Sequence, residues 1–304
     1  MLEQQTITNN LVNPLINDFA QIINTKANKG ELAKEKANDF LEFLSEVEQN
    51  FLQHSIVTKN AYTNWFEKGE VSLEELRYFT IQFSVFSNQF LIAQLKKMIN
   101  ADSLAAMRSA KEILANEIGV VFRSQSPKKQ TTLNDEEKEQ FGDPELVSTS
   151  GSIDGGVFRF TAGHFEWLLN FASALGLTFN DIGKSRQANE TTKFFCDELC
   201  HIYGSEDANI AAGASFAIEN WAAAGFWQQL VDGLAIIKQN QVPKLPLAFF
   251  TWHNRLESQH AGNTFAELET IFFEPNFDKE KFLTGGIAML NALEIFWNGL
   301  FINE

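Results

Sequence analysis

Apolar residues recur at intervals of three and four positions along most of this chain, and that spacing predicts helices. Proline, which interrupts helices, is absent between Pro14 and Pro127 and again between Pro144 and Pro243. We find no convincing run with the alternation of a β-strand. The sequence therefore predicts an all-α fold, with helices over the ranges 14–26, 31–54, 58–68, 73–98, 103–117, 161–175, 187–203, 207–238, 246–274 and 278–302.

Local signals support two of the predicted helix starts. Ser72 followed by Glu75 is a capping-box pattern, and Ser103 can cap the next helix. The helix that begins after Ser72 has almost no charge between Tyr78 and Leu95. Such a composition is typical of a helix that is buried on most of its sides.

The helical pattern breaks between about Ser124 and Gly156. This stretch contains two prolines, several Ser and Thr residues, an acidic run at 135–139 and a glycine-containing end at 151–156. Such a composition predicts a long loop. Because the helices on either side look like partners, we interpret 124–160 as an insertion, or lid, within a single domain that spans 1–304 and begins with N-terminal helices over 1–70.

Composition and charge narrow the classes of partner. The 304 residues carry a net charge of -15, which argues against nucleic acid and anionic membranes as partners. From the polar start we expect no signal peptide, and no apolar stretch approaches the roughly 20 residues needed to cross a bilayer. Cys196 and Cys200 lie one helical turn apart and are expected to be reduced thiols, so we expect a cytoplasmic protein.

The strongest candidate for chemistry is the stretch from Trp252 to His260. His253, Glu257 and His260 stand at positions i, i+4 and i+7, which share one face of a helix. Two of the five histidines of the chain lie here. The spacing suits two imidazoles and a carboxylate on one metal site, whereas the alternative is an amphipathic helix with two chance histidines and a solvated glutamate.

Three further polar residues stand in apolar surroundings, where a carboxylate is costly unless it is paired or bound to a metal. Glu219 is the lone acid of an alanine-rich helix, Glu117 lies near the end of a helix, and His164 begins an apolar helix. Each has a plain alternative: Glu219 and Glu117 could be surface residues, and His164 could be a structural histidine at a helix N-terminus.

A second group competes for the role of metal site. Glu198 and His201 have the Glu-x-x-His spacing of ferritin-like di-iron bundles. If the helices before and after Gly204 form an antiparallel hairpin, His201 and Glu219 differ in depth by roughly 12 Å. We therefore interpret the group of Cys196, Asp197, Glu198, Cys200 and His201 as a surface and boundary cluster.

Four segments in order along the chain resemble a known family: 76–83, Arg108 with 116–119, 164–168 and 174–177. Together they resemble the haem-oxygenase-like di-metal oxidases and oxygenases, including the CADD-like proteins, whose relatives in fold are the TenA-type thiaminases and the pyrroloquinoline-quinone synthases. The resemblance extends from about Glu74 to the end of the chain and implies a haem-oxygenase-like helical bundle.

The resemblance also implies a ligand set for two iron ions, or for iron with manganese, that bind O2 between them. The matching positions are Glu117, His164, Glu219, His253, Glu257 and His260, with Glu117 and Glu257 as the catalytic carboxylates. Two departures stand out. Glu257 occupies a position that is often Asp in the family, and 47 positions separate Glu117 from His164, where the family usually has fewer than a dozen. The site survives if the insertion returns the chain to its point of departure.

The implied activity is that of a non-haem di-iron oxidase or oxygenase that acts on a small amino-acid-like or apolar substrate by C–C cleavage, desaturation or N-oxygenation. An external electron donor and a homodimer are possible partners. Candidate walls of the substrate pocket are Tyr78, Phe83, Phe86, Phe90, Phe216 and Phe249. Three alternatives stay open: a self-sacrificing CADD-like synthase of an aromatic amine that consumes its own tyrosine, with Tyr78 as the candidate; a metal-free TenA-like enzyme; and a non-enzymatic metal-binding helical protein.

Overall fold

The structure, a computed structural model, describes the backbone of residues 14–121, 151–153 and 156–302. Side chains at 14–15, 121, 151–160 and 256–263 lie outside the described part. The α-helices are α1 (Pro14–Asn28), α2 (Lys34–Val47), α3 (Ser55–Thr58), α4 (Ala61–Phe66), α5 (Leu73–Ile99), α6 (Leu104–Glu117), α9 (His164–Ala174), α10 (Glu190–Glu198), α11 (Ala208–Ala222), α12 (Phe226–Asn240), α13 (Ala248–Phe272) and α14 (Lys279–Asn298). Two π-helical turns, η1 (Glu48–Leu52) and η4 (Leu199–Tyr203), and the 3₁₀ turn η3 (Ser185–Gln187) extend or connect them. The predicted all-α helical bundle is confirmed.

The predicted helix starts at Ser72 and Ser103 are also correct. The Ser72 hydroxyl accepts a hydrogen bond from the Glu75 N–H at 3.2 Å, and the Glu75 carboxylate accepts one from the Ser72 N–H at 2.8 Å. The Ser103 hydroxyl accepts from the Ala106 N–H at 3.1 Å. These bonds satisfy N–H groups that the first turn of a helix leaves without a partner.

The prediction of one helix over 207–238 is wrong, because the structure divides this range into α11 and α12. The break lies at Gly225, whose φ of 101° is in the left-handed region that favours glycine. The alanines before Gly225 favour helix by themselves, so only the glycine marks the end of α11.

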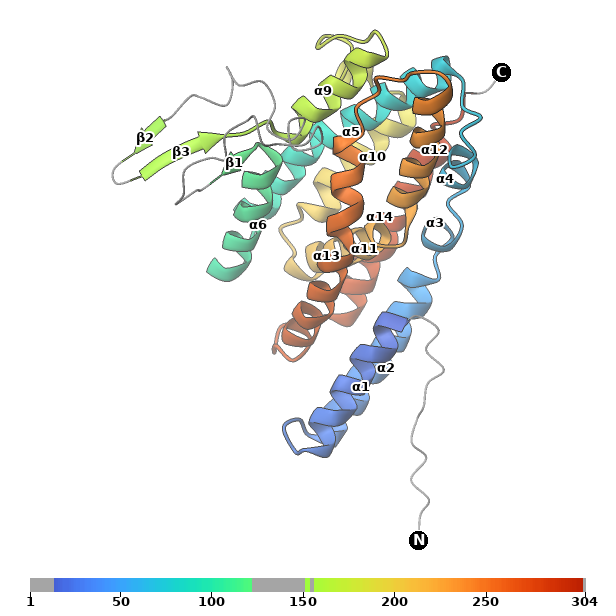
Figure 1. Ribbon diagram of the computed structural model, residues 1–304. Coiled ribbons are helices and arrows are strands. Elements are labelled where there is room, and N and C mark those ends of the chain that lie inside the picture. Colours follow the sequence, from blue (N-terminus) through green and yellow to red (C-terminus); the bar gives the residue numbers. More distant parts are fainter. Residues whose placement is uncertain (1–13, 122–150, 154–155, 303–304) are drawn as a thin grey trace.

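Long helices lie side by side in the bundle, and the α1–α2 hairpin extends below it (Figure 1). The hairpin contacts the second half of α13 through Lys26 Nζ, which lies 2.6 Å from the Glu269 carboxylate, and through Phe19, whose ring centroid is 5.6 Å from that of Phe265. One cluster of buried apolar residues runs from Ile16 to Leu300. Many of its members are phenylalanines, so the high Phe content builds the core; the extent of the domain stays a prediction.

The ends of the insertion form short strands that the sequence pattern did not reveal. Three short strands occur among the described residues: β1 (Val120–Val121), β2 (Gly151–Ile153) and β3 (Gly156–Phe160). β3 pairs antiparallel with both others, and Val120 lies opposite Phe160 in the register. The residues 122–150 and 154–155 lie outside the described part, so the expected lid is not tested.

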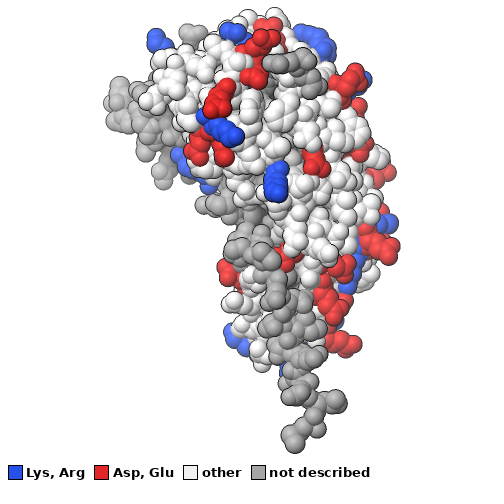
Figure 2. All heavy atoms as spheres, turned by 90° about the vertical axis from the view of Figure 1, so that its right-hand side faces the viewer, with Lys and Arg blue, Asp and Glu red and all other residues white. Residues whose placement is uncertain are grey.

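Figure 2 shows one face of the molecule, on which acidic and basic side chains lie near one another. They border a broad area without charged side chains. Within the described residues, none of the helices combines the length and the hydropathy that crossing a bilayer requires. The expectations about nucleic acid, membranes and location in the cytoplasm stay predictions.

Candidate metal centre

Glu117 is the last residue of α6, and the chain turns sharply directly after it. Gly119 has a φ of 72°, and a Cβ atom there would lie 2.2 Å from the Thr161 carbonyl oxygen. Only glycine readily adopts this φ and leaves room for the Thr161 backbone to approach so closely. The turn therefore directs the chain from α6 straight into β1, beside the segment that leads to α9.

His164 is the first residue of α9, and it follows Gly163. The Gly163 N–H donates to the Glu166 carboxylate at 2.5 Å, and a Cβ atom at Gly163 would lie 3.0 Å from the Glu117 carbonyl oxygen. The end of α6 and the start of α9 therefore lie in direct backbone contact. Two hydrogen bonds from Thr161 to the Gly119 carbonyl, from its N–H at 2.8 Å and its hydroxyl at 3.2 Å, hold this contact together.

The pairing of β1 with β3 explains how the chain returns from the insertion to the neighbourhood of Glu117. Strand β1 leaves α6 and strand β3 returns to α9, so the antiparallel ladder brings both ends of the insertion to one place. The two ends of the segment between Glu117 and His164, which are 47 positions apart, are thereby held together. The condition that the sequence left open is met: the chain returns to its point of departure.

His253 lies in the second turn of α13, on the other side of the site. Its Nδ1 lies 2.6 Å from the Phe249 carbonyl oxygen. Its ring stacks on the indole of Trp227, with centroids 4.6 Å apart and planes 17° apart, and also contacts the Phe249 ring at 4.3 Å. A proton on Nδ1 that donates to Phe249 presents the lone pair of Nε2 on the opposite side of the ring.

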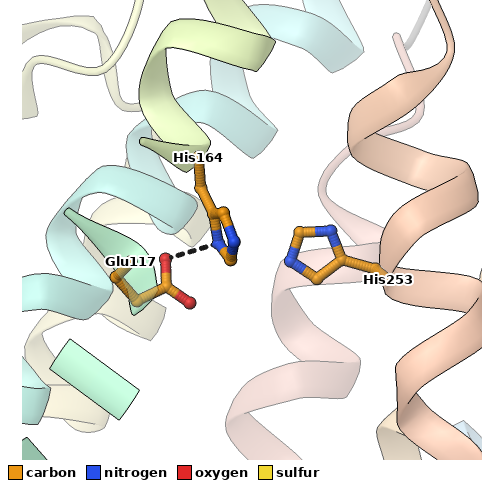
Figure 3. Close-up of side chains that lie close together, drawn as sticks. All are labelled: Glu117, His164 and His253. Atoms are coloured by element: carbon orange, nitrogen blue, oxygen red, sulfur yellow. Dashed lines mark ion pairs between the residues drawn. The ribbon is translucent and has the colours of Figure 1, made fainter. Parts of the chain in front are cut away.

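Glu117, His164 and His253 converge on one point from three helices (Figure 3). One carboxylate oxygen and one nitrogen from each imidazole all lie within 4.8 Å of one another. His164 Nδ1 lies 2.8 Å from Glu117 Oε2, and these two side chains are only 6% and 15% exposed. The imidazole centroids of His164 and His253 are 4.7 Å apart.

The donor atoms of this group fit a transition-metal ion. Two imidazole nitrogens and one carboxylate oxygen are a ligand set that suits iron, manganese or zinc. His164 Nδ1 is buried and makes no hydrogen bond of normal geometry within the described residues, although Glu117 Oε2 is close. A buried nitrogen of this kind is costly unless something binds it, and a metal ion between the carboxylate and the imidazole would do so.

Aromatic rings enclose the two histidines. Around His164 lie the rings of Trp167, Trp252 and Phe249, with centroids at 5.2, 4.7 and 6.0 Å. Such a wall limits the access of water and strengthens electrostatic interactions inside it. Trp252 directly precedes His253 and was part of the motif that the sequence singled out, whereas no pattern in the sequence signalled Trp227.

The other three predicted ligands are not part of this group as described. Glu219 is half-buried on α11, and the described group does not include it. Glu257 and His260 lie in the helical backbone of α13, but their side chains lie outside the described part. Their roles as ligands stay predictions, as does the second metal ion.

The six residues predicted to line a substrate pocket occupy several places. Asn189 Nδ2 donates to the Tyr78 hydroxyl at 2.6 Å, and Phe83 and Phe249 contact each other with ring centroids 6.1 Å apart. Phe86 and Phe90 contact the rings of Phe195 and Tyr203 at 5.0 and 5.6 Å, and Phe216 lines a cavity described below. Phe249 thus lies beside His164 and His253, and Phe216 lines the cavity. The assignment of all six residues to one substrate pocket stays a prediction.

The competing group around Glu198 lies elsewhere. His201 is exposed on η4, and neither Cys196 nor Cys200 lines the cavity that contains Phe216. Burial raises the pKa of the Cys196 thiol to about 12 and also raises the pKa of Cys200, although Lys96 opposes the shift at Cys200. These thiols are therefore protonated at neutral pH, which makes them poor nucleophiles.

Comparison with known proteins shows what this fold is similar to. No protein-family model and no curated protein sequence matches the chain. Solved structures do match, among them two crystal structures, at 2.00 and 1.35 Å resolution, of a CADD-like protein of unknown function from Nostoc punctiforme PCC 73102. The TM-scores are 0.52 and 0.50 at 15% sequence identity, and the alignments cover 94% of this chain and 96% and 94% of those chains. At that identity the likeness concerns the fold alone: over nearly its whole length, this chain is folded like a CADD-like protein.

Proposed function

We propose that this chain is a non-haem di-iron oxidase or oxygenase that uses O2 to oxidise a small amino-acid-like or apolar substrate. The observation that carries the proposal is the convergence of Glu117, His164 and His253 on one point, within walls of aromatic rings. The likeness in fold to a CADD-like protein supports it, as does the family resemblance of the sequence.

Glu117, His164 and His253 would hold one ion. Glu219, Glu257 and His260 are the other three residues of the six-ligand set that the resemblance implies, and with them the set would be large enough for a second ion. When bound, two iron ions supply electrons and open coordination positions for the activation of O2. Glu117 and Glu257 are the carboxylates that we assign to catalysis.

The protein itself orients and shields these ligands. The His253 Nδ1–H donates a hydrogen bond to the Phe249 carbonyl, which fixes the tautomer, while Trp227 fixes the plane of the ring by stacking. The backbone contact between Gly119 and Thr161 holds Glu117 beside His164. Trp167 and Trp252 keep water away from the imidazole of His164.

Anaerobic loading with Fe(II), followed by mixing with O2, tests the proposal. We expect the loaded protein to consume O2 much faster than the same concentration of Fe(II) in buffer, and to give a transient absorption band in stopped-flow spectra. Protein loaded with Zn(II) is the control and should consume none, because Zn(II) has no redox chemistry. If iron binds but O2 is consumed no faster than in buffer, a non-enzymatic metal-binding protein is the better description.

A further inference from the structure

A cavity of about 450 Å³ opens between the C-terminal end of α5, α6, α11 and the second half of α13. Its apolar lining includes Phe216, Leu268, Ile271, Phe277 and Phe282. Cavities of roughly 300–1,000 Å³ with mostly apolar walls and a few polar groups are typical of small-molecule sites. This cavity is therefore large enough for a molecule the size of an amino acid.

Lys97 provides a positive charge in the wall of this cavity. Its Nζ donates to the Ser215 hydroxyl at 2.6 Å and to the Tyr203 hydroxyl at 3.3 Å, and it lies 4.5 Å from the centroid of the Tyr203 ring. Tyr203 in turn donates to Gln94 Oε1 at 2.8 Å. These two hydroxyl groups fix the position of the ammonium but do not neutralise its charge. They accept hydrogen bonds from two of its three N–H donors, so one donor is left for a ligand.

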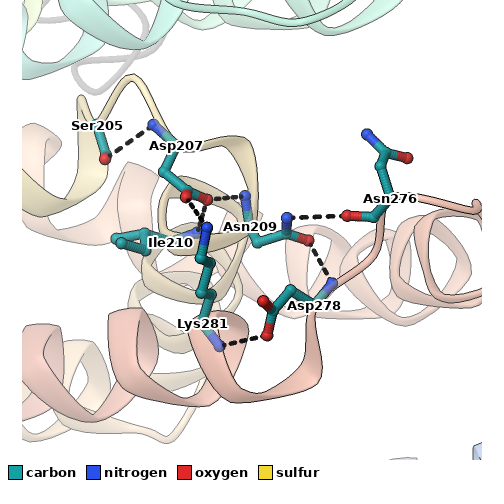
Figure 4. A network of polar contacts seen from close by, with 7 residues as sticks. All are labelled: Ser205, Asp207, Asn209, Ile210, Asn276, Asp278 and Lys281. Atoms are coloured by element: carbon teal, nitrogen blue, oxygen red, sulfur yellow. Dashed lines mark hydrogen bonds and ion pairs between the residues drawn. The ribbon is translucent and has the colours of Figure 1, made fainter.

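Lys97 has no ion pair within the described residues, unlike several other lysines. Lys26 and Lys279 pair with Glu269 and Asp39, each at 2.6 Å. Near the cavity, Lys281 pairs with Asp207 at 2.7 Å in the polar network that joins α11 to α14 (Figure 4). A half-buried ammonium that contacts no carboxylate among the described residues is costly, and an anionic group of a ligand in contact with Nζ would relieve that cost.

The pKa of Lys97 reflects the same surroundings. Burial lowers the pKa of its ammonium, whereas Glu219 and Glu267 act in the opposite direction. A carboxylate bound in contact with Nζ would add a favourable interaction with the charged form. It would therefore hold the lysine protonated.

Negative charge lies on the outer part of the same cavity. Asp102, Glu267 and Glu274 are exposed residues that line it. A simple anion would be attracted by Lys97 and repelled by these carboxylates. A ligand with a carboxylate for Lys97 and an ammonium for the acidic residues complements both, and the apolar walls would accept its side chain.

Three helices carry both cavity residues and candidate metal ligands. Ser109 lies eight residues before Glu117 on α6, about 12 Å along the axis, and Ser215 lies four residues before Glu219 on α11, about 6 Å. Thr264 lies eleven residues after His253 on α13, about 16 Å. The cavity is thus displaced along the bundle from these candidate metal ligands by one to three helical turns.

We propose that this cavity binds a zwitterionic amino acid with an apolar side chain, whose carboxylate contacts Lys97 and whose ammonium faces Glu267 and its acidic neighbours. That the bound amino acid is the substrate rests on the proposed function. Within that function, the cavity defines the substrate class, and Lys97 is the group that selects it.

Binding to the metal-free, full-length protein tests this site without any O2 chemistry. The probes are L-phenylalanine, 3-phenylpropanoate, which lacks the ammonium, and 2-phenylethylamine, which lacks the carboxylate, each titrated by calorimetry. A hydrogen bond to a charged group contributes about 1.5–3 kcal/mol, so each analogue should bind roughly tenfold or more weakly than L-phenylalanine. If either analogue binds as tightly as L-phenylalanine, or if the wild-type protein does not bind L-phenylalanine, the proposal is wrong.

Substitution at Lys97 assigns the carboxylate subsite. Lys97→Met keeps an unbranched side chain of similar length but removes the ammonium, and it should reduce binding of L-phenylalanine to the level of 2-phenylethylamine. Lys96→Met is the matched control: Lys96 is exposed, does not line the cavity and carries the same charge, so binding should stay at the wild-type level. Lys97→Gln serves if the methionine variant does not fold. An unchanged preference for L-phenylalanine in a folded Lys97 variant would overturn the assignment, whatever the outcome of the O2 experiment.

Discussion

His253→Ala should weaken binding of the first metal ion by roughly 100-fold or more, since loss even of a residue that only supports a ligand costs 10–100-fold in affinity. The substitution removes one of the three donors that lie within 4.8 Å of one another. It also removes the ring that Trp227 and Phe249 hold in place. Competition between the protein and a chromophoric chelator for Fe(II), under anaerobic conditions, measures the change.

His201→Ala is the matched control for this experiment. His201 is an exposed histidine on η4 outside the described metal group, so its loss should leave the affinity for Fe(II) unchanged. His164→Ala and Glu117→Gln should resemble His253→Ala. Wild-type affinity in all three of these variants would show that the metal binds elsewhere or that the protein has no such site.

Gly213→Ala should strongly destabilise the bundle. Helices α11 and α14 touch at Gly213, where an added Cβ atom would lie 1.9 Å from the Phe282 carbonyl oxygen. Backbone cannot move aside as a flexible side chain can, so the helices must separate. We expect a loss of about 3 kcal/mol in the free energy of unfolding, which lowers Tm by roughly 5–10 °C.

Thermal unfolding followed by circular dichroism checks this prediction, with two comparisons. Gly285→Ala should behave similarly, because its Cβ atom would lie 2.2 Å from the Ile210 carbonyl oxygen on the other side of the same contact. Thr284→Ala, at the exposed neighbouring position, should change stability by less than about 0.5 kcal/mol. A Tm of Gly213→Ala within a degree of the wild-type value would mean that α11 and α14 do not pack this closely.

The periodic spacing of apolar residues was sufficient to predict most of the helices, because burial of one face is what holds each helix in a bundle. It failed at Gly225, where the alanines on the preceding turn favour a continued helix and a single backbone conformation ends it. It also failed at β1 and β3. Strands of two and five residues are too short to show alternation, and their pairing partner lies about 40 positions away.

The candidate site was predictable in composition but not in assembly. Residue types and order identified Glu117, His164 and His253, yet nothing in the sequence could say whether the insertion brings Glu117 back to His164. That depends on a backbone contact at Gly119 and Gly163 and on the ladder of β1 with β3, all of them contacts between distant parts of the chain. The stacking of Trp227 on His253 is likewise a tertiary contact with no local signal.

Anomalous diffraction from crystals loaded with Fe(II) without oxygen tests the metal centre most directly. We expect a peak at the iron edge within roughly 2.3 Å of donor atoms of Glu117, His164 and His253, because bonds from first-row metals to imidazole and carboxylate fall within that range. A second peak should contact at least one of Glu219, Glu257 and His260. A crystal that contains iron but shows no peak at Glu117, His164 and His253, or a peak only beside Glu198 and His201, would show that these three residues are not the metal ligands.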